Sequence, residues 1–362
     1  MTTARPARPQ TPSTPARTRR ALGLALLCCI AAPIAFIGPP PAHAQSKELN
    51  LYSARHYQSD NELYAEFSKQ TGIKINQIQA QDEAILERLK SEGKASPADI
   101  IFLVDAARLW KAQSEGLFQP VKSSILSNAL PAHMRASDLW FGLTTRARIF
   151  VVDPGKVSPN LVQRYDDLAR PELKGKICTR SGAHPYMLSL VASIAAHQGE
   201  AKAQAWANGV VANLARTPRG GDTDQIKGVM SGECAVAITN TYYLVRLLKS
   251  KNNDERTAAA RLSVVWPNQK TTGTHVNVSG AGMARHAPNA ENAKRFLEFL
   301  ASPAAQAHLA NANNEWPASE KVTISNPELA ALGQFKADTI SIGKIADMQP
   351  VAARIIDRSG WK

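Results

Sequence analysis

Strands and helices alternate regularly in the first part of the mature chain, and this alternation constrains the fold more than any other feature. Each of three apolar strand-like runs is followed by a helical pattern; the pairs are 48–53 with 60–70, 73–78 with 84–91, and 99–104 with 106–114. A glycine stands two residues after each helical pattern, where helices often end. Three strand–helix units in a row are typical of a parallel sheet covered by helices. The sequence therefore predicts an α/β fold.

The later part of the chain keeps both kinds of element but is less regular. Strand-like runs lie at 147–152, 176–179, 234–238, 262–266 and 276–283, and helical patterns at 186–197, 201–214, 241–249 and 289–300. Two α/β lobes joined by crossing strands fit this order, with candidate crossings at 143–150 and 265–274. We predict a first lobe of residues 45–145 plus 266–318 and a second of 146–265 plus 319–362. A ligand would then bind between the lobes, near strand ends and helix N-termini.

The first 44 residues have the order of a secretory signal. Five arginines and no acidic residue come first, then an apolar run, then a small-x-small site that predicts cleavage after Ala44. Pro33 interrupts the apolar run, which disfavours a retained membrane anchor. Arg19 and Arg20 leave twin-arginine export open beside the general route. We predict an exported, periplasmic protein.

Charge and length limit the classes of protein to which the chain could belong. The 318 residues from 45 to 362 suit two domains of ordinary size. Without the five signal arginines the formal charge falls from +13 to +8, which is a mild excess over this length. No dense basic cluster interleaved with aromatics and no nucleic-acid motif is present, so we predict no nucleic-acid partner.

Two cysteines, Cys178 and Cys234, follow the predicted cleavage site. An even pair in an exported chain favours a disulfide over a metal site. Each cysteine lies at the edge of a strand-like run, so neighbouring strands could carry the bridge.

Four of the seven tyrosines lie where a predicted strand runs into a helix. Tyr57 follows the first strand, Tyr186 opens the helix at 186–197, and Tyr242 and Tyr243 open the helix at 241–249. Such junctions form the ligand-binding edge of an α/β sheet.

Phenolate oxygen is a hard, anionic donor that suits a hard cation such as Fe(III). A phenol has a pKa near 10, so a bound cation must displace its proton, and nearby positive charge or a helix N-terminus lowers that cost. His56 would add one neutral nitrogen. The alternative for an isolated tyrosine pair is core or interface packing, and it is the commoner one. His184 fits a solvated loop histidine.

The chain resembles bacterial periplasmic ferric-iron-binding proteins, and most closely the branch that includes the cyanobacterial and Campylobacter-type iron binders. The motifs that carry the resemblance, in order along nearly all of the mature chain, are YSARHY at 52–57, SPADI at 96–100, TRAR at 145–148, GGD at 220–222, NTYY at 240–243, PNQ at 267–269 and GTHVNVSG at 273–280.

The resemblance implies a two-lobed, hinge-closing fold of the type II periplasmic-binding-protein kind, often called a Venus flytrap. It implies iron held by one histidine and four tyrosines, or by the tyrosines alone: His56, Tyr57, Tyr186, Tyr242 and Tyr243. A synergistic anion such as carbonate or citrate occurs in some relatives and is not required in this branch. Four arginines could lie just outside the iron ligands, where their positive charge would favour the phenolate forms and orient them. They are Arg55, Arg146, Arg148 and Arg180.

The leading hypothesis is a monomeric binding protein that captures Fe(III) and delivers it to an inner-membrane ABC permease. An anion or polyamine binder of the same architecture is the alternative, although it would need hydroxyls or carboxylates where this chain places phenols. An enzyme is disfavoured, since the sequence holds no His-Glu-x-x-His run, Gly-x-Ser-x-Gly elbow or phosphate loop.

Overall fold

The computed structural model describes residues 47–55 and 57–362, and residues 46–362 form one compact unit. The predicted secretory signal and His56 therefore lie outside the described residues. Within the described part, no helix is both long enough and apolar enough to span a bilayer.

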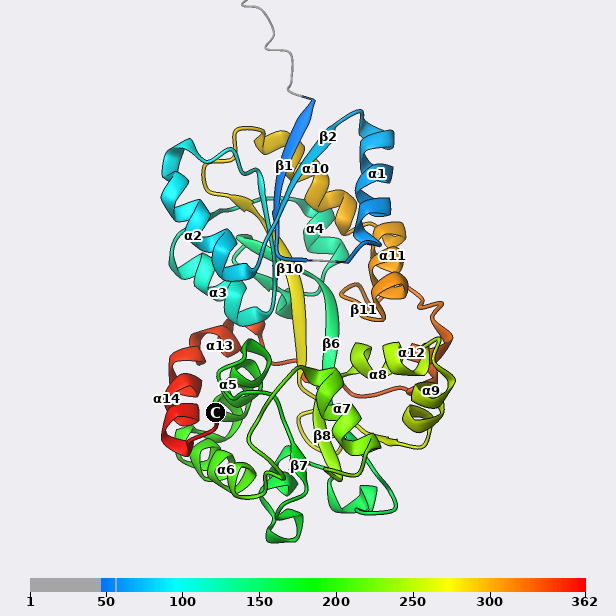
Figure 1. The fold of residues 1–362 in the computed structure, drawn as a ribbon. Coiled ribbons are helices and arrows are strands. Elements are labelled where there is room, and N and C mark those ends of the chain that lie inside the picture. Colours follow the sequence, from blue (N-terminus) through cyan, green and yellow to red (C-terminus); the bar gives the residue numbers. More distant parts are fainter. Residues whose placement is uncertain (1–46, 56) are drawn as a thin grey trace, which may run out of the picture. The chain divides into compact units, whose positions relative to one another are not determined.

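The first lobe is built on the three strand–helix units that the sequence predicts (Figure 1). Its opening elements are β1 (Glu48–Ser53), α1 (Asp60–Thr71), β2 (Lys74–Gln79), α2 (Asp82–Glu92), β3 (Ile100–Val104) and α3 (Ala106–Ser114). β1 pairs in parallel with both β2 and β3. Gly72 ends α1 with a φ of 71°, a left-handed conformation that glycine adopts without strain. The predicted parallel α/β arrangement is confirmed.

Two long strands connect the lobes. β6 (Trp140–Val152) and β10 (Val276–Ala284) pair antiparallel, and in Figure 1 they run from the upper lobe to the lower one. At one end β10 pairs with β3, and at the other β6 pairs with β8 (Val236–Asn240) and β9 (Ser263–Val265). The first predicted crossing is therefore confirmed. The second predicted crossing, at 265–274, was wrong. The second crossing strand is β10, and residues 266–275 lie in turns and loop between β9 and β10.

The second lobe surrounds β7 (Ile177–Cys178) and β8, which pair in parallel. Its helices are α5 (Pro185–Gln198), α6 (Glu200–Ala212), α7 (Asp222–Met230), α8 (Thr241–Leu248) and α9 (Asn253–Ala260). A disulfide joins Cys178 to Cys234, with 5.8 Å between the Cα atoms. The predicted disulfide is confirmed; Cys178 lies in β7, and Cys234 precedes β8 by two residues.

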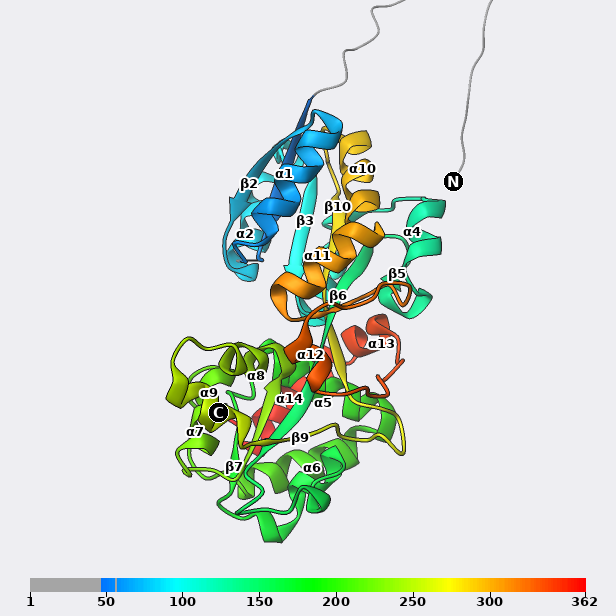
Figure 2. The ribbon, with the colours of Figure 1, turned by 90° about the vertical axis from the view of Figure 1, so that its right-hand side faces the viewer.

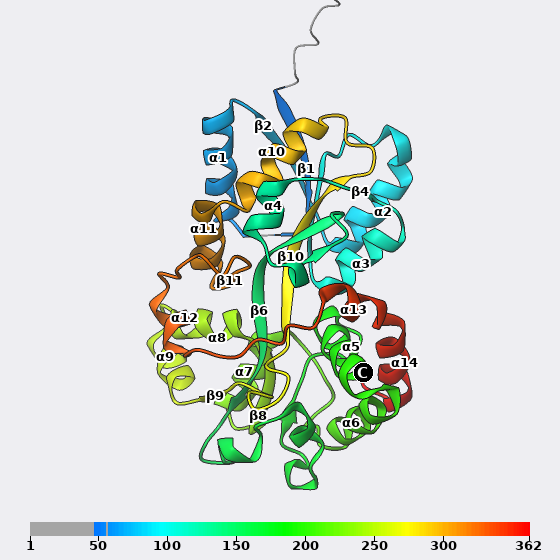
Figure 3. The same cartoon turned by 180° about the vertical axis from the view of Figure 1, so that it is seen from behind.

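The remaining chain returns from the first lobe to the second. It comprises α10 (Ala290–Leu300), α11 (Pro303–Asn313), β11 (Trp316–Pro317), α12 (Pro327–Ala331), α13 (Ile342–Asp347) and α14 (Gln349–Ser359). α10 and α11 cover one face of the first lobe's sheet (Figure 2). α13 lies between α3 and α5 (Figure 3), with Ile342 in the first lobe's core and Ile345 in the second lobe's core.

Short elements complete the two lobes. The strands are β4 (Phe118–Gln119) and β5 (Arg135–Ala136), the additional helix is α4 (Ser124–Ala129), and the 3₁₀ turns are Gly93–Ala95, Ala132–Met134, Pro159–Leu161, Tyr165–Ala169 and Pro171–Leu173. The predicted two-lobed α/β fold is confirmed, and the residue boundaries given for the lobes stay a prediction.

Candidate functional site

The four junction tyrosines lie at the places that the sequence indicates. Tyr57 stands in the loop between β1 and α1, Tyr186 in the first turn of α5, and Tyr242 and Tyr243 in the first turn of α8. Tyr242 is buried, and the other three are partly buried. His56, which precedes Tyr57, lies outside the described residues.

The structure brings three phenols of the second lobe together. The hydroxyl oxygens of Tyr186 and Tyr242 are 3.1 Å apart, within hydrogen-bond distance. The Tyr242 and Tyr243 ring centroids are 4.2 Å apart. Residues separated by 56 positions in the sequence thus share one site.

Arg246 connects Tyr57 of the first lobe to this group. Its guanidinium carbon lies 5.5 Å from the ring centroid of Tyr57, 5.0 Å from that of Tyr242 and 5.6 Å from that of Tyr243. These distances are typical of cation–π contacts. The four phenols, which we call the tyrosine cluster, therefore form one connected group that draws on both lobes.

Burial and mutual repulsion keep three of these phenols, those of Tyr57, Tyr186 and Tyr242, protonated. Burial is the largest cause that raises the pKa of Tyr57, to about 12, and Glu315 adds to it, while Arg55, Arg146 and Arg246 oppose the shift. Burial also raises the pKa of Tyr186 and of Tyr242, and each of these pKa values is raised further by neighbouring phenols of the cluster. Ionising several of these groups at once is therefore unfavourable unless a cation lies among them.

A buried ion cluster supports Tyr57 in the first lobe. The Arg55 guanidinium lies 4.7 Å from the Tyr57 ring centroid. Its Nε is 2.7 Å from Asp60 Oδ2, and its Nη1 is 3.4 Å from Glu315 Oε2. All three side chains are buried, and the two carboxylates offset the cost of burial, so that the pKa of Arg55 is raised and it keeps its charge beside the phenol.

Three arginines face the Tyr186 ring. The distances from their guanidinium carbons to the ring centroid are 5.6 Å for Arg146, 5.7 Å for Arg148 and 5.1 Å for Arg180. Arg146 donates from Nη1 to Ser279 at 2.7 Å, while its Nε and Nη2 atoms have no hydrogen-bond partner among the described residues. The four arginines predicted as outer cations therefore all lie against a tyrosine of the cluster.

Asp222 holds the second lobe's part of the site in place. Its Oδ2 accepts hydrogen bonds from Arg148 Nη1 at 2.5 Å and from the backbone N–H of Asn240 at 2.7 Å. Its Oδ1 lies 3.7 Å from Arg180 Nη1. Asn240 ends β8 two residues before Tyr242, so one carboxylate fixes both the arginines and the start of α8.

Sequence reasoning did not identify four of these residues as parts of the site: Asp60, Asp222, Arg246 and Glu315. The GGD motif at 220–222 contained a signal for Asp222. Helical spacing could have revealed Arg246, since residues three and four positions apart share a helix face. Asp60 and Glu315 reach Arg55 through tertiary contacts that the sequence pattern does not report.

His184 contributes to local structure. Its Nδ1 accepts a hydrogen bond from the backbone N–H of Tyr186 at 3.2 Å, which caps the N-terminus of α5. Burial, followed by Arg180, lowers the pKa of His184 to about 3, so the ring is neutral. Its role as a solvated loop residue is therefore corrected to that of a helix cap.

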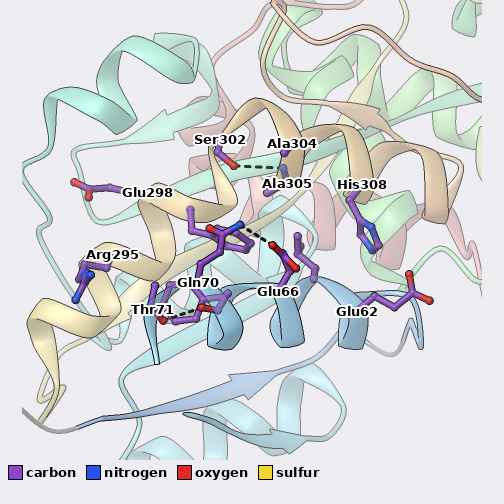
Figure 4. A pocket seen from close by; sticks show the side chains of 13 residues that line it. Glu62, Glu66, Gln70, Thr71, Arg295, Glu298, Ser302, Ala304, Ala305 and His308 are labelled. Atoms are coloured by element: carbon purple, nitrogen blue, oxygen red, sulfur yellow. Dashed lines mark hydrogen bonds between the residues drawn. The ribbon is translucent and has the colours of Figure 1, made fainter. Parts of the chain in front are cut away.

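Other candidate metal sites are not apparent in the described part of the chain. Within it, no group of three or more His, Cys, Asp or Glu side chains could hold a metal ion. A separate groove of about 510 Å³ on the first lobe lies between α1, α10 and α11 (Figure 4). It has Glu62 and Glu66 at its rim and Phe67 and Phe299 in its lining, but the described lining includes no tyrosine. The tyrosine cluster is the candidate site.

Comparison with known proteins places the chain in a family. Residues 95–335 match the sequence signature of the bacterial extracellular solute-binding proteins. This chain belongs to that family. The predicted resemblance is thereby confirmed at the family level.

Several relatives of this solute-binding protein are similar over almost their whole length. Iron uptake protein A1 of Synechocystis is 46% identical over 338 residues, which are 93% of each chain. A Trichodesmium protein in complex with iron and citrate ligands has a TM-score of 0.84 and 43% identity, and the match covers 87% of this chain and 100% of that one. The ferric binding protein from Campylobacter jejuni has a TM-score of 0.81 and 41% identity, with the same coverage.

Proposed function

We propose that this solute-binding protein captures a ferric ion between its lobes, with Tyr57, Tyr186, Tyr242 and Tyr243 as ligands. The observation that carries the proposal is the 3.1 Å separation of the Tyr186 and Tyr242 hydroxyl oxygens. Two phenol oxygens this close can bind one metal ion. His56 stays a predicted nitrogen ligand.

The choice of a trivalent ion follows from the electrostatics. The pKa values of Tyr57, Tyr186 and Tyr242 are raised, so several phenolates are stable together only with a strong positive charge among them. Fe(III) supplies that charge and, as a hard ion, favours oxygen donors. Relatives named for iron uptake or ferric binding support the same choice.

Arginines around the cluster make phenolate formation less costly. Arg55 and Arg246 lie over the Tyr57 ring, and Arg146, Arg148 and Arg180 lie over the Tyr186 ring. The free donor atoms of Arg146 also support an anion, such as citrate or carbonate, that completes the coordination when present without being required. The Trichodesmium relative holds both iron and citrate.

Ligands from both lobes would couple iron binding to lobe closure. Tyr57 belongs to the first lobe and the other three tyrosines to the second, so one metal ion draws the lobes together. Binding then shifts the population toward the closed state, because only that state offers the full ligand set.

The proposed partner is an inner-membrane ABC permease, and the proposed compartment is the periplasm. Both fit an extracellular solute-binding protein of bacteria. The chain would bind iron stoichiometrically and catalyse no reaction. A monomeric state and the lack of a nucleic-acid partner stay predictions, as does the cleavage of residues 1–44.

An anion or polyamine binder is not favoured. A polyamine site needs carboxylates in the cleft, and Asp60, Asp222 and Glu315 are already paired with arginines. An anion site fits the arginines alone but gives no role to four clustered phenols.

A titration with ferric citrate tests the proposal. The purified chain should turn orange-red, from phenolate-to-iron charge transfer, and the absorbance should saturate at one iron per chain. Gallium(III) should compete for the site without giving colour in this range, since it has no accessible charge-transfer state. A colourless mixture at saturating iron would contradict the proposal.

A further inference from the structure

The loop between β7 and α5 presents two residues to the tyrosine cluster. Arg180 lies within it, with its guanidinium 5.1 Å from the Tyr186 ring centroid, and Tyr186 follows it at the start of α5. The loop contains no strand or helix of its own between residues 179 and 184. Something else must therefore fix its position.

The segment after α14, residues 360–362, makes two hydrogen bonds to this loop; we call the segment the tail. The indole N–H of Trp361 donates to Thr179 Oγ1 at 3.0 Å. The backbone N–H of Gly182 donates to the carbonyl oxygen of Lys362 at 3.1 Å. One bond lies on each side of Arg180.

The tail approaches the loop so closely that only glycine fits at position 182. A Cβ atom there would lie 2.7 Å from the carbonyl oxygen of Trp361 and 2.8 Å from its ring Cγ. Both distances are well inside van der Waals contact, so any side chain would push the tail and the loop apart.

The tail is itself anchored in the second lobe. Gly360 ends α14 with a φ of 68° and turns the chain toward the loop. Trp361 is only 2% exposed, and its ring centroid lies 5.7 Å from that of Trp206. α14 packs on α5 and α6 (Figure 1), so the tail rests on the same helix that carries Tyr186.

We infer that Trp361 is a positioning residue for iron binding: its indole N–H, together with the Lys362 carbonyl, holds the loop so that Tyr186 meets Tyr242. The inference rests on the proposed function. Trp361 does not touch the ligand. It acts through Tyr186, whose hydroxyl must stay within 3.1 Å of the Tyr242 hydroxyl.

The test compares Trp361→Phe with Trp140→Phe. Both changes remove the same atoms from a buried side chain, and the Trp140 indole N–H donates to Gln113 Oε1 in the first lobe, away from the loop. The measurement is iron affinity by competition with citrate, together with the visible charge-transfer band. Trp361→Phe should lower the affinity about three- to tenfold, the effect of one lost hydrogen bond, and should shift the band. Trp140→Phe should change neither.

A double-mutant cycle with Tyr186→Phe isolates the pathway. If Trp361 acts through Tyr186, Trp361→Phe should cause no further loss of affinity once the Tyr186 hydroxyl is gone. An equal loss in both backgrounds would overturn the inference, as would equal effects of Trp361→Phe and Trp140→Phe.

Gly182→Ala is a second variant that removes no core side chain. It should separate tail and loop and lower the affinity in the same direction, and an unchanged affinity would also count against the inference. These outcomes are distinct from failure of the proposed function: if the unaltered chain forms no coloured complex, that function fails, whereas a coloured wild-type complex with unaffected variants defeats only the role of Trp361.

Discussion

The first lobe places one described phenol, Tyr57, in the site, whereas the second lobe places three. Arg246 connects Tyr57 to the others, with its guanidinium carbon 5.5 Å from the Tyr57 ring centroid. Tyr186 and Tyr242, in contrast, are already joined by their hydroxyls within the second lobe. The supporting ion pairs differ as well, with Arg55–Asp60 in one lobe and Arg148–Asp222 in the other.

This difference suggests an order of events. The second lobe holds a preassembled group of donors, and preorganised ligands bind with less loss of entropy. The first lobe supplies Tyr57 when the lobes come together. We therefore expect the second lobe to capture iron first and Tyr57 to complete the site on closure.

The largest effect should come from changing Tyr242 and Tyr243 to phenylalanine together. This double variant removes two donors from the preassembled group, so the visible band should disappear and iron affinity should fall by more than the roughly 100-fold that is typical of losing an outer-shell partner. The measurement is the ferric citrate titration. Retained colour would show that the second lobe does not dominate capture.

Tyr57→Phe should lower iron affinity by about 100-fold while some colour remains, because the second lobe's phenols are intact. It should also prevent closure. Small-angle X-ray scattering with and without iron should show compaction for the unaltered chain and none for the variant. Full compaction of the variant would mean that Tyr57 does not link the lobes.

Acid should weaken iron binding. The pKa of Tyr57 is raised to about 12, mainly by burial, and those of Tyr186 and Tyr242 are raised as well, so iron must displace protons. Affinity should fall about tenfold per pH unit for each phenol proton displaced. Proton release on iron binding, followed with a pH indicator, checks the number, and binding without proton release would contradict it.

The same raised pKa values affect the stability of the iron-free chain in the opposite direction. A phenol that holds its proton more tightly when folded contributes stability below pH 10, its ordinary pKa. This contribution is lost as the pH rises through about 12 for Tyr57. Urea unfolding of the iron-free chain should thus show falling stability above pH 10, and Tyr57→Phe should reduce that fall.

Two of the buried carboxylates, Asp222 and Asp60, offer a matched pair of variants. Asp222→Asn should lower iron affinity about tenfold, because Asp222 holds Arg148 and also the backbone before Tyr242. Asp60→Asn should lower it less, since Asp60 contacts Arg55 without holding a tyrosine segment of the second lobe. Each variant should lose stability in urea, as each removes the carboxylate charge closest to a buried arginine. Equal affinities for the two variants would remove the distinction between the lobes.

Arg246→Gln should have the smallest effect. Arg246 is exposed, and cation–π contacts at exposed sites contribute about 0.5–1 kcal/mol, which corresponds to a two- to fivefold loss of affinity. Because its guanidinium spans Tyr57 and Tyr242, the loss should shrink in a Tyr57→Phe background. The measurement is the iron affinity of each variant, determined by isothermal titration in competition with citrate.

The sequence predicted the α/β class, the first crossing strand, the disulfide and the positions of the tyrosines at strand–helix junctions. These features depend on local signals: the pattern of apolar residues, the even number of cysteines in the mature chain, and the turn residues next to apolar runs. The parallel strands then carry the junctions to one edge of each lobe, so local pattern and topology together bring Tyr186 near Tyr242.

Other features depend on contacts between distant segments, which no local pattern reports. Glu315 meets Arg55 across 260 positions, and Trp361 meets Thr179 across 182. The second crossing was placed too early: the strand at 276–283 was predicted, but the crossing was assigned to 265–274, where an apolar start is followed by polar turn residues.

Diffraction at the iron absorption edge from crystals of the iron-loaded chain tests the central claim most directly. The account predicts one anomalous peak, which marks a single iron ion. This ion should be bonded to the phenol oxygens of Tyr186, Tyr242 and Tyr243 from one lobe and of Tyr57 from the other. A peak bound by residues of a single lobe, or one remote from these four oxygens, would contradict it.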